Sequence, residues 1–120
     1  MLFRSGIAVQ IISAWRPNTK TEAKRFGLTS QQELIERYKR GEPGIFKPAP
    51  AGRSYHNWGL AVDVRTAPPE ALSRLGEIAE QFGLRWGGRF GDPVHLDAGN
   101  DFSIEKAKAR FKVRNLVEVV

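Results

Sequence analysis

The stretch Ser54–Arg65 reads Ser-Tyr-His-Asn-Trp-Gly-Leu-Ala-Val-Asp-Val-Arg, and the prediction of the fold starts from it. Its second half alternates, so that aliphatic residues point to one face of a strand and Asp63 points to the opposite face. The aliphatic face is predicted to enter a core. A turn centred on Gly59 can fold His56 back towards Asp63. The aliphatic residues of this strand are Leu60, Val62 and Val64.

A second segment, Pro93–Asp97, repeats the alternation. Val94 and Leu96 are predicted to face inward, which leaves His95 and Asp97 facing outward. The only two histidines of the chain lie in these two segments, each near a carboxylate. Two imidazoles and one carboxylate, with a position open for water, form the ligand set of a hydrolytic zinc site.

Length and composition limit the class of protein. The 120 residues are predicted to form a single domain over residues 1–120. The 19 basic and 13 acidic residues give a net charge of +6, which favours anionic partners such as nucleic acid, acidic lipid or a cell-wall polymer. The absence of cysteine excludes disulfides and thiolate zinc clusters. No stretch resembles a signal peptide or a membrane span, so the protein is expected to be made in the cytoplasm without an export signal.

The N-terminal half is predicted to contain one strand and one or two helices. Ile7–Trp15 is rich in β-branched residues and predicts a buried strand. Thr19–Gly27 is either a short helix or an inserted loop. Thr29 or Ser30 is expected to cap the next helix, and Gly44–Gly52, with two prolines, is expected to be an extended surface loop.

The C-terminal half is predicted to add helices around the two outward-facing segments. A helix opened by Ala67–Glu70 is expected to cover a core with an apolar stripe that ends at Phe82. Asp101 or Ser103 is expected to cap a last basic helix, and Leu116–Val120 is either an edge strand or frayed. Together these patterns predict an α+β fold with a small, largely antiparallel sheet, carrying the zinc on one face and helices on the other.

Three short motifs follow one another in this strand context. They are Ser54-x-His56-x-x-Gly59-x-Ala61-x-Asp63, Trp86-Gly87 and Asp92-x-x-His95. In this order they resemble the zinc peptidases of the D-alanyl-D-alanine carboxypeptidase type. That group includes VanY-like enzymes and the L-alanyl-D-glutamate endopeptidases used as phage endolysins. The resemblance runs from about Ile11 to Asp97 and implies the zinc peptidase fold shared by DD-peptidases and the Hedgehog signalling domain.

The resemblance implies a role for each residue near the metal. His56, Asp63 and His95 would hold Zn²⁺, which activates water and polarises the scissile carbonyl. Asp92, three residues before His95, would be the general base, with Asp97 as the alternative.

The resemblance also implies residues that bind substrate. Arg16 matches the arginine of the first family motif, which binds the substrate or stabilises its oxyanion. Ser54 matches a position close to the metal. Trp58 and Trp86 are assigned to the substrate site, with cleft walls or core packing as the alternatives to direct contact. Gln31 matches a glutamine of the family or is an exposed helix residue.

The implied function is zinc-dependent hydrolysis of a peptide bond in peptidoglycan stem peptides. A compact chain with no leader or anchor is most similar to an L-alanyl-D-glutamate endopeptidase of the endolysin type, acting on the cell wall after phage-type release. The alternatives are a D-Ala-D-Ala carboxypeptidase or dipeptidase, and an inactive zinc-stabilised binding module.

An anionic wall would suit the basic surface. Specific nucleic-acid binding is not expected, because the aromatic residues are not interleaved with the basic ones. The oligomeric state stays open. The segment Asn18–Ser30 is longer than the usual link in the family, which bears on the rim of the cleft.

Overall fold

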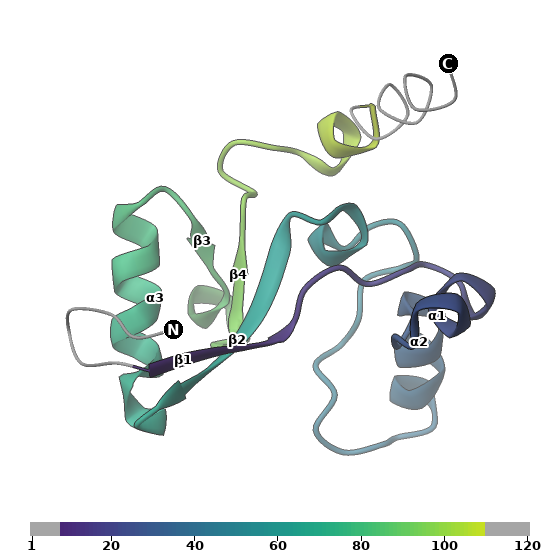
Figure 1. The fold of residues 1–120 in the computed structure, drawn as a ribbon, viewed down its shortest axis with the longest axis horizontal. Coiled ribbons are helices and arrows are strands. Elements are labelled where there is room, and N and C mark those ends of the chain that lie inside the picture. The colour runs from purple at the N-terminus through teal and green to yellow at the C-terminus, as the bar shows by residue number, and fades with distance from the viewer. Residues whose placement is uncertain (1–7, 110–120) are drawn as a thin grey trace.

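A computed structural model describes residues 8–109 of the chain, and a four-stranded sheet lies at its centre (Figure 1). The strands lie in the order β1-β2-β4-β3, and each neighbouring pair is antiparallel. This small antiparallel sheet with its helices confirms the predicted α+β class. The strands are β1 (Ala8–Ser13), β2 (Ala61–Ala67), β3 (Arg85–Trp86) and β4 (His95–Asp97).

The register between β2 and β4 determines which side chains share a face. Asp63 lies opposite His95, and Val62 lies opposite Leu96. Residues directly opposite each other in an antiparallel pair project to the same side of the sheet. Val62, Val64 and Leu96 therefore belong to the core on one face, while Asp63 and His95 meet on the other. The predicted alternation is confirmed for these residues, whereas Val94, just before β4, is not among the core residues.

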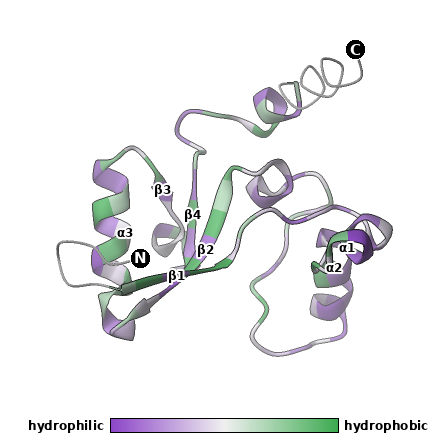
Figure 2. Ribbon diagram, viewed as in Figure 1, coloured by the Kyte–Doolittle hydropathy of each residue, from purple (hydrophilic) through white to green (hydrophobic). Residues whose placement is uncertain are grey.

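Helix α3 (Leu72–Gln81) covers the core face of the sheet. Its buried residues Leu75 and Ala79 pack with Trp86 of β3, and Figure 2 shows α3 divided between hydrophobic and hydrophilic residues. Gly76 permits this packing, because a Cβ atom there would lie 2.2 Å from the Trp86 indole. The short turn η2 (Pro69–Ala71) leads into the helix, with proline in its first turn as predicted.

Two apolar predictions are wrong. The strand β1 was predicted to be buried, but Ile11 and Ile12 are exposed, because β1 lies at the edge of the sheet and only Val9 packs against the core. Phe82 was predicted to belong to the core stripe of α3, yet it is 81% exposed. It caps the C-terminus of the helix, where the chain turns away from the core.

Two helices precede the central motif and lie away from α3 (Figure 1). Helix α1 (Lys20–Phe26) resolves the alternatives for its segment in favour of a helix: the Thr19 side chain caps it and Gly27 ends it at φ 66°. Helix α2 (Gln31–Lys39) begins at Ser30, whose hydroxyl accepts a hydrogen bond from the Glu33 amide. The chain after α2 is an extended loop, as predicted for Gly44–Gly52.

The last described segment is helical over 104–109. Of the two predicted caps, Ser103 caps it, because its hydroxyl accepts a hydrogen bond from the Lys106 amide. The alternatives for Leu116–Val120 lie outside the described residues. Among residues 8–109, no helix has the length and apolar character needed to span a bilayer.

Candidate metal centre

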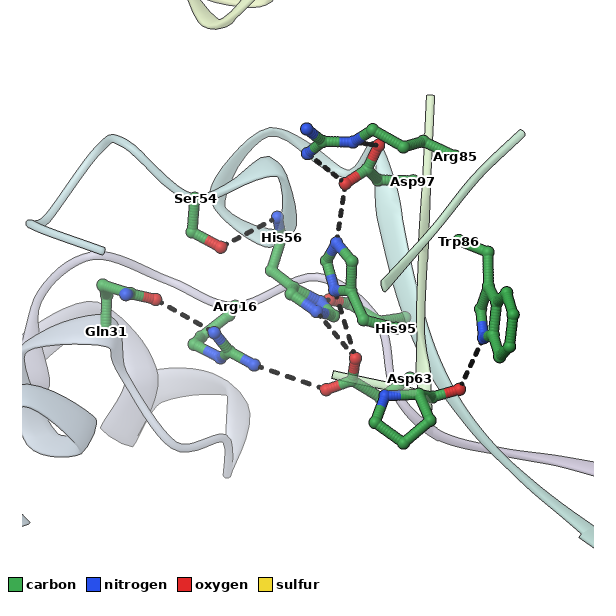
Figure 3. A network of polar contacts seen from close by, with 11 residues as sticks. Arg16, Gln31, Ser54, His56, Asp63, Arg85, Trp86, His95 and Asp97 are labelled. Atoms are coloured by element: carbon green, nitrogen blue, oxygen red, sulfur yellow. Dashed lines mark hydrogen bonds and ion pairs between the residues drawn. The ribbon is translucent and has the colours of Figure 1, made fainter. Parts of the chain in front are cut away.

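Three side chains from three elements converge on the face of the sheet opposite the core (Figure 3). His56 comes from the turn η1 (Tyr55–Trp58), Asp63 from β2 and His95 from β4. Asp63 Oδ1 lies 3.2 Å from His56 Nε2 and 3.3 Å from His95 Nδ1. The structure thus brings together the three residues predicted to bind metal.

The turn η1 places His56 by local hydrogen bonds. The Ser54 hydroxyl accepts a hydrogen bond from the His56 amide, and the Asn57 side chain accepts one from the Ser54 amide, which completes a capping box. Gly59 ends the turn at φ 71°, a conformation that favours glycine. Ser54 therefore shapes the turn that carries His56, besides lining the cavity described below.

A backbone carbonyl orients the His56 ring. His56 Nδ1 lies 2.7 Å from the carbonyl oxygen of Ala14, so Nδ1 carries the proton and donates it to that oxygen. Nε2 is then the ring nitrogen that faces Asp63, and it is the one that can bind a metal. Such a hydrogen bond from the second ring nitrogen is the usual support of a metal-binding histidine.

A carboxylate orients the His95 ring instead. His95 Nε2 lies 2.7 Å from Asp97 Oδ2, which leaves Nδ1 facing Asp63. Asp97 is 1% exposed and accepts two hydrogen bonds from Arg85, at 2.9 and 2.6 Å, and one from the Gly99 amide. From the sequence, Asp97 was expected only as an alternative base, and no role was predicted for Arg85.

The ionisation states suit a metal site. Burial raises the pKa of the Asp63 carboxyl, but the hydrogen bonds with His56 and His95 lower it by a larger amount. The net shift of the pKa is therefore downward, and Asp63 is ionised. Burial lowers the pKa of His95, whereas hydrogen bonds to Asp63 and Asp97 raise it, and the result is a pKa of about 9. An ionised Asp63 beside a positive His95 ring shows that the site favours charge of both signs, and a bound cation would take over the role of the His95 proton.

The donor set fits zinc. Two imidazole nitrogens and one ionised carboxylate are ligands that Zn²⁺ prefers in catalytic sites. A tetrahedral ion with bonds of about 2.0 Å places its ligand atoms about 3.3 Å apart. The two distances measured from Asp63 Oδ1, 3.2 and 3.3 Å, agree with that spacing.

Asp92 lies in the turn that leads into β4. Its amide donates to the carbonyl of Gly87, and its own carbonyl accepts a hydrogen bond from the His95 amide. Gly87 is required for this approach, because a Cβ atom there would lie 2.2 Å from the Asp92 carbonyl oxygen. Burial raises the pKa of the Asp92 carboxyl, and the nearby Asp63 adds to that effect, while His95 opposes it.

Arg16 reaches the centre from the segment after β1. Its Nη2 atom lies 3.7 Å from Asp63 Oδ2, and its Nη1 atom donates to Gln31 Oε1 at 3.0 Å. Burial lowers the pKa of Arg16, and Asp63 and Asp92 oppose that shift. Arg16 therefore stays a cation next to the candidate ligands.

Gln31 is fully buried, so the alternative of an exposed helix residue is wrong. It accepts the hydrogen bond from Arg16 and donates to the carbonyl of Ala49 at 2.7 Å. Asn57, for which no role was predicted, donates to the carbonyl of Arg16 and to Gln31 Oε1. The Ser-x-x-Asn spacing of the capping box is the sequence signal that could have drawn attention to Asn57.

A cavity of about 410 Å³ opens onto the centre. His56, Asp63, His95, Asp92 and Arg16 all line it, together with the loop that follows α2. Val94 also lines the cavity and is not among the core residues, so its predicted inward orientation is not confirmed.

The two tryptophans assigned to the substrate site are not among the residues that line this cavity. Trp86 belongs to the core and donates its Nε1 proton to the Pro93 carbonyl. Trp58 is partly buried and donates to the carbonyl of Gly52. Both tryptophans thus donate hydrogen bonds to the backbone of neighbouring loops, and neither lines the cavity.

Comparison with known families gives one finding. The model of a family described as D-alanyl-D-alanine carboxypeptidase matches residues 48–98. That segment contains the three candidate metal ligands and Asp92, whereas Arg16 and Gln31 lie outside it. Comparison with curated proteins gave no match. The matched segment, with its candidate metal centre, supports the D-alanyl-D-alanine carboxypeptidase family and a peptidase activity for this chain.

Proposed function

We propose that this protein is a zinc-dependent peptidase that hydrolyses a peptide bond in peptidoglycan stem peptides, as an L-alanyl-D-glutamate endopeptidase acting on the cell wall. The observation that carries the proposal is the convergence of His56, Asp63 and His95 beside a cavity that Asp92 also lines. The match over residues 48–98 supports the peptidase class. The net charge of +6 suits an anionic wall.

His56 Nε2, His95 Nδ1 and the Asp63 carboxylate would hold the zinc. When bound there, Zn²⁺ activates water and polarises the scissile carbonyl. Ala14 and Asp97 engage the other ring nitrogens, so the nitrogens that face Asp63 are the ones that would coordinate zinc, and His95 Nδ1 would release its proton on binding.

Asp92 acts as the proton carrier. Its carboxylate accepts the proton of the attacking water as the new C–O bond forms. It then passes that proton to the leaving amine as the C–N bond breaks, so the carboxylate is restored. Burial raises the pKa of Asp92, which makes it a stronger base than an exposed aspartate.

Arg16 orients the substrate. Its guanidinium is fixed by Gln31 and lies beside Asp63, so it presents a forked donor at the edge of the candidate metal centre. A donor in that place binds a substrate carboxylate or the oxyanion that develops at the scissile carbonyl.

The second candidate is hydrolysis of D-Ala-D-Ala by a carboxypeptidase, which the description of the matching family favours. An inactive zinc-stabilised module is less consistent with the site. Such a module has no need of Asp92 in the cavity, with a carboxyl pKa raised by burial.

Mass spectrometry of purified peptidoglycan after incubation with the zinc-loaded protein tests the function. New alanine C-termini with new glutamate N-termini indicate the endopeptidase, and released free alanine indicates the carboxypeptidase. The matched control is Asp92→Asn, which keeps the shape of the side chain and removes its basicity. We expect it to retain zinc and to cleave ~10²–10⁴-fold more slowly. Absence of any cleavage by the zinc-loaded protein contradicts the proposal, and near-normal cleavage by Asp92→Asn contradicts the role of Asp92.

A further inference from the structure

Arg85 offers a second fixed guanidinium at the cavity, in addition to Arg16. We propose that Arg85 forms a subsite for a substrate carboxylate, so that the preferred stem peptides carry a free acidic group near the scissile bond. This inference rests on the proposed function, which it makes more specific. It concerns a residue to which neither the motifs nor the family match gives a role.

The Arg85 side chain is held in one orientation. Its Nε and Nη2 atoms donate to the two oxygens of Asp97. The guanidinium carbon lies 5.2 Å from the ring centroids of both Tyr55 and Phe90. A cation held by a forked ion pair and by two aromatic rings loses little conformational entropy when it binds a ligand.

The same guanidinium still has a donor to offer. Within the described part of the chain, its Nη1 atom makes no hydrogen bond, and Figure 3 shows this atom pointing away from Asp97. The side chain is 42% exposed and lines the cavity. A carboxylate that reaches Nη1 therefore gains a charge-assisted hydrogen bond and does not have to break the pair with Asp97.

Arg85 and Arg16 lie at opposite ends of one line of contacts (Figure 3). Arg16 contacts Asp63, which contacts His95 Nδ1. On the other side of the ring, His95 Nε2 contacts Asp97, which contacts Arg85. The candidate metal centre thus lies between two arginines. If a substrate places its scissile bond at this centre, the parts of the substrate on either side of that bond approach different guanidinium groups.

The charge of the cavity favours an anionic substrate. Four cationic residues line it, against the two carboxylates Asp63 and Asp92. Arg85 is held more firmly than Arg53, the other exposed arginine of the cavity lining, whose ion pair with Glu105 joins side chains that are 50% and 69% exposed. Exposed ion pairs of this kind do little to hold a side chain in one orientation. The four cationic residues are Arg16, Lys47, Arg53 and Arg85.

Three synthetic stem peptides identify the carboxylate. One has all its carboxyl groups free, one has the α-carboxyl group of D-glutamate as an amide, and one has its C-terminus as an amide. We expect the zinc-loaded protein to show a kcat/KM for the free peptide roughly tenfold above that of one amide, since a charged hydrogen bond is lost. The amide that is cleaved more slowly identifies the carboxylate that Arg85 binds.

The variant Arg85→Gln should bring that ratio to about one, because it has no charge to discriminate carboxylate from amide. Arg85→Lys keeps a charge next to Asp97 and should retain part of the preference. The matched control is Arg89→Gln: Arg89 is exposed, is paired with Glu80 and is not among the residues lining the cavity. It should leave the ratio unchanged. A variant that merely loosens the metal centre lowers the rates for all peptides together, so the ratio separates the two roles.

Calorimetric titration of the zinc-loaded Asp92→Asn protein with the same peptides measures binding without cleavage. If the wild-type protein cleaves none of the peptides, the proposed function fails, and the titration then decides the subsite. A preference for the carboxylate peptide that Arg85→Gln removes supports the subsite. Equal affinities for all three peptides, or a preference that persists in Arg85→Gln, would overturn it.

Discussion

The two sides of the cavity are built by different means. On one side, Asp63 and His95 face each other because β2 and β4 pair in register. On the other side, Arg16 is held by side-chain contacts with Gln31 and Asp63 and by backbone contacts with η1, and Gln31 in turn reaches the carbonyl of Ala49. The first arrangement follows from sheet geometry, whereas the second depends on polar contacts between residues far apart in the sequence.

This difference predicts separable functions. Changes on the sheet side should alter metal binding and activity together, because the candidate ligands lie there. Changes on the Arg16 side should alter substrate turnover and leave the metal in place. Each of the following predictions tests one side of that comparison.

The largest effect is expected from removal of a candidate ligand. His56→Ala and His95→Ala should each lose stoichiometric zinc, and their peptidase activity should fall to background, because two remaining protein ligands hold Zn²⁺ poorly. Elemental analysis of the purified variants measures the zinc, and peptide cleavage measures the activity.

Two aspartate variants serve as a comparison for these histidine variants. Asp63→Asn should lose zinc with the histidine variants, whereas Asp101→Asn, a change at an exposed residue outside the cavity, should keep it. Full zinc occupancy in both histidine variants would mean that the metal is bound elsewhere.

Much of the sheet side could be predicted from the sequence. The alternation in β2 and β4 is local, so it indicated that Asp63 and His95 project away from the aliphatic residues. The caps at Ser30 and Ser103 are also local signals. The role of these side chains in metal binding remains a prediction, but their convergence is observed.

The other contacts could not be read from local patterns. The exposure of Ile11 depends on the position of β1 at the sheet edge, which its own composition does not reveal. The clamp of Arg85 on Asp97 joins residues 12 apart, and no periodicity reports such a pair. Gln31 has a polar side chain, so burial was not the obvious prediction, and only its three partners make burial favourable.

An intermediate effect is expected from Asp97, which supports His95 on the sheet side. Asp97→Asn cannot provide the charged acceptor for His95 Nε2, so we expect zinc affinity to fall by about 10–100-fold. The hydrogen bond between His56 and the Ala14 carbonyl is not altered by this substitution, so the His56 ring provides an internal reference. Competition with a chromophoric chelator measures the affinity, and ¹⁵N shifts of the two rings report their tautomers.

The outcome for the His95 ring distinguishes positioning from general stability. A shift in the tautomer of His95, with that of His56 retained, supports the role of Asp97. Unchanged zinc affinity in a folded Asp97→Asn protein contradicts it.

The smallest effect is expected from Gln31, on the Arg16 side. Gln31→Met has a similar volume but cannot accept a hydrogen bond from Arg16 or donate one to Ala49. Loss of one charge-assisted bond costs about 1.5 kcal/mol, so we expect kcat/KM to fall roughly tenfold while zinc content stays unchanged. Steady-state kinetics with a stem peptide and elemental analysis of the same sample measure the two quantities.

A double-mutant cycle shows whether Gln31 acts through Arg16. Arg16→Met removes the guanidinium that Gln31 holds, so adding Gln31→Met to it should change kcat/KM by less than about twofold. A purely structural role for Gln31 predicts the opposite, because loosening the Ala49 loop would reduce the rate by the same factor in either background. A tenfold loss in both backgrounds, or loss of zinc from Gln31→Met, would show that the two sides of the cavity are not independent. Non-additive kinetics with full zinc occupancy would show instead that the sheet holds the metal and that the Arg16–Gln31 pair acts on the substrate.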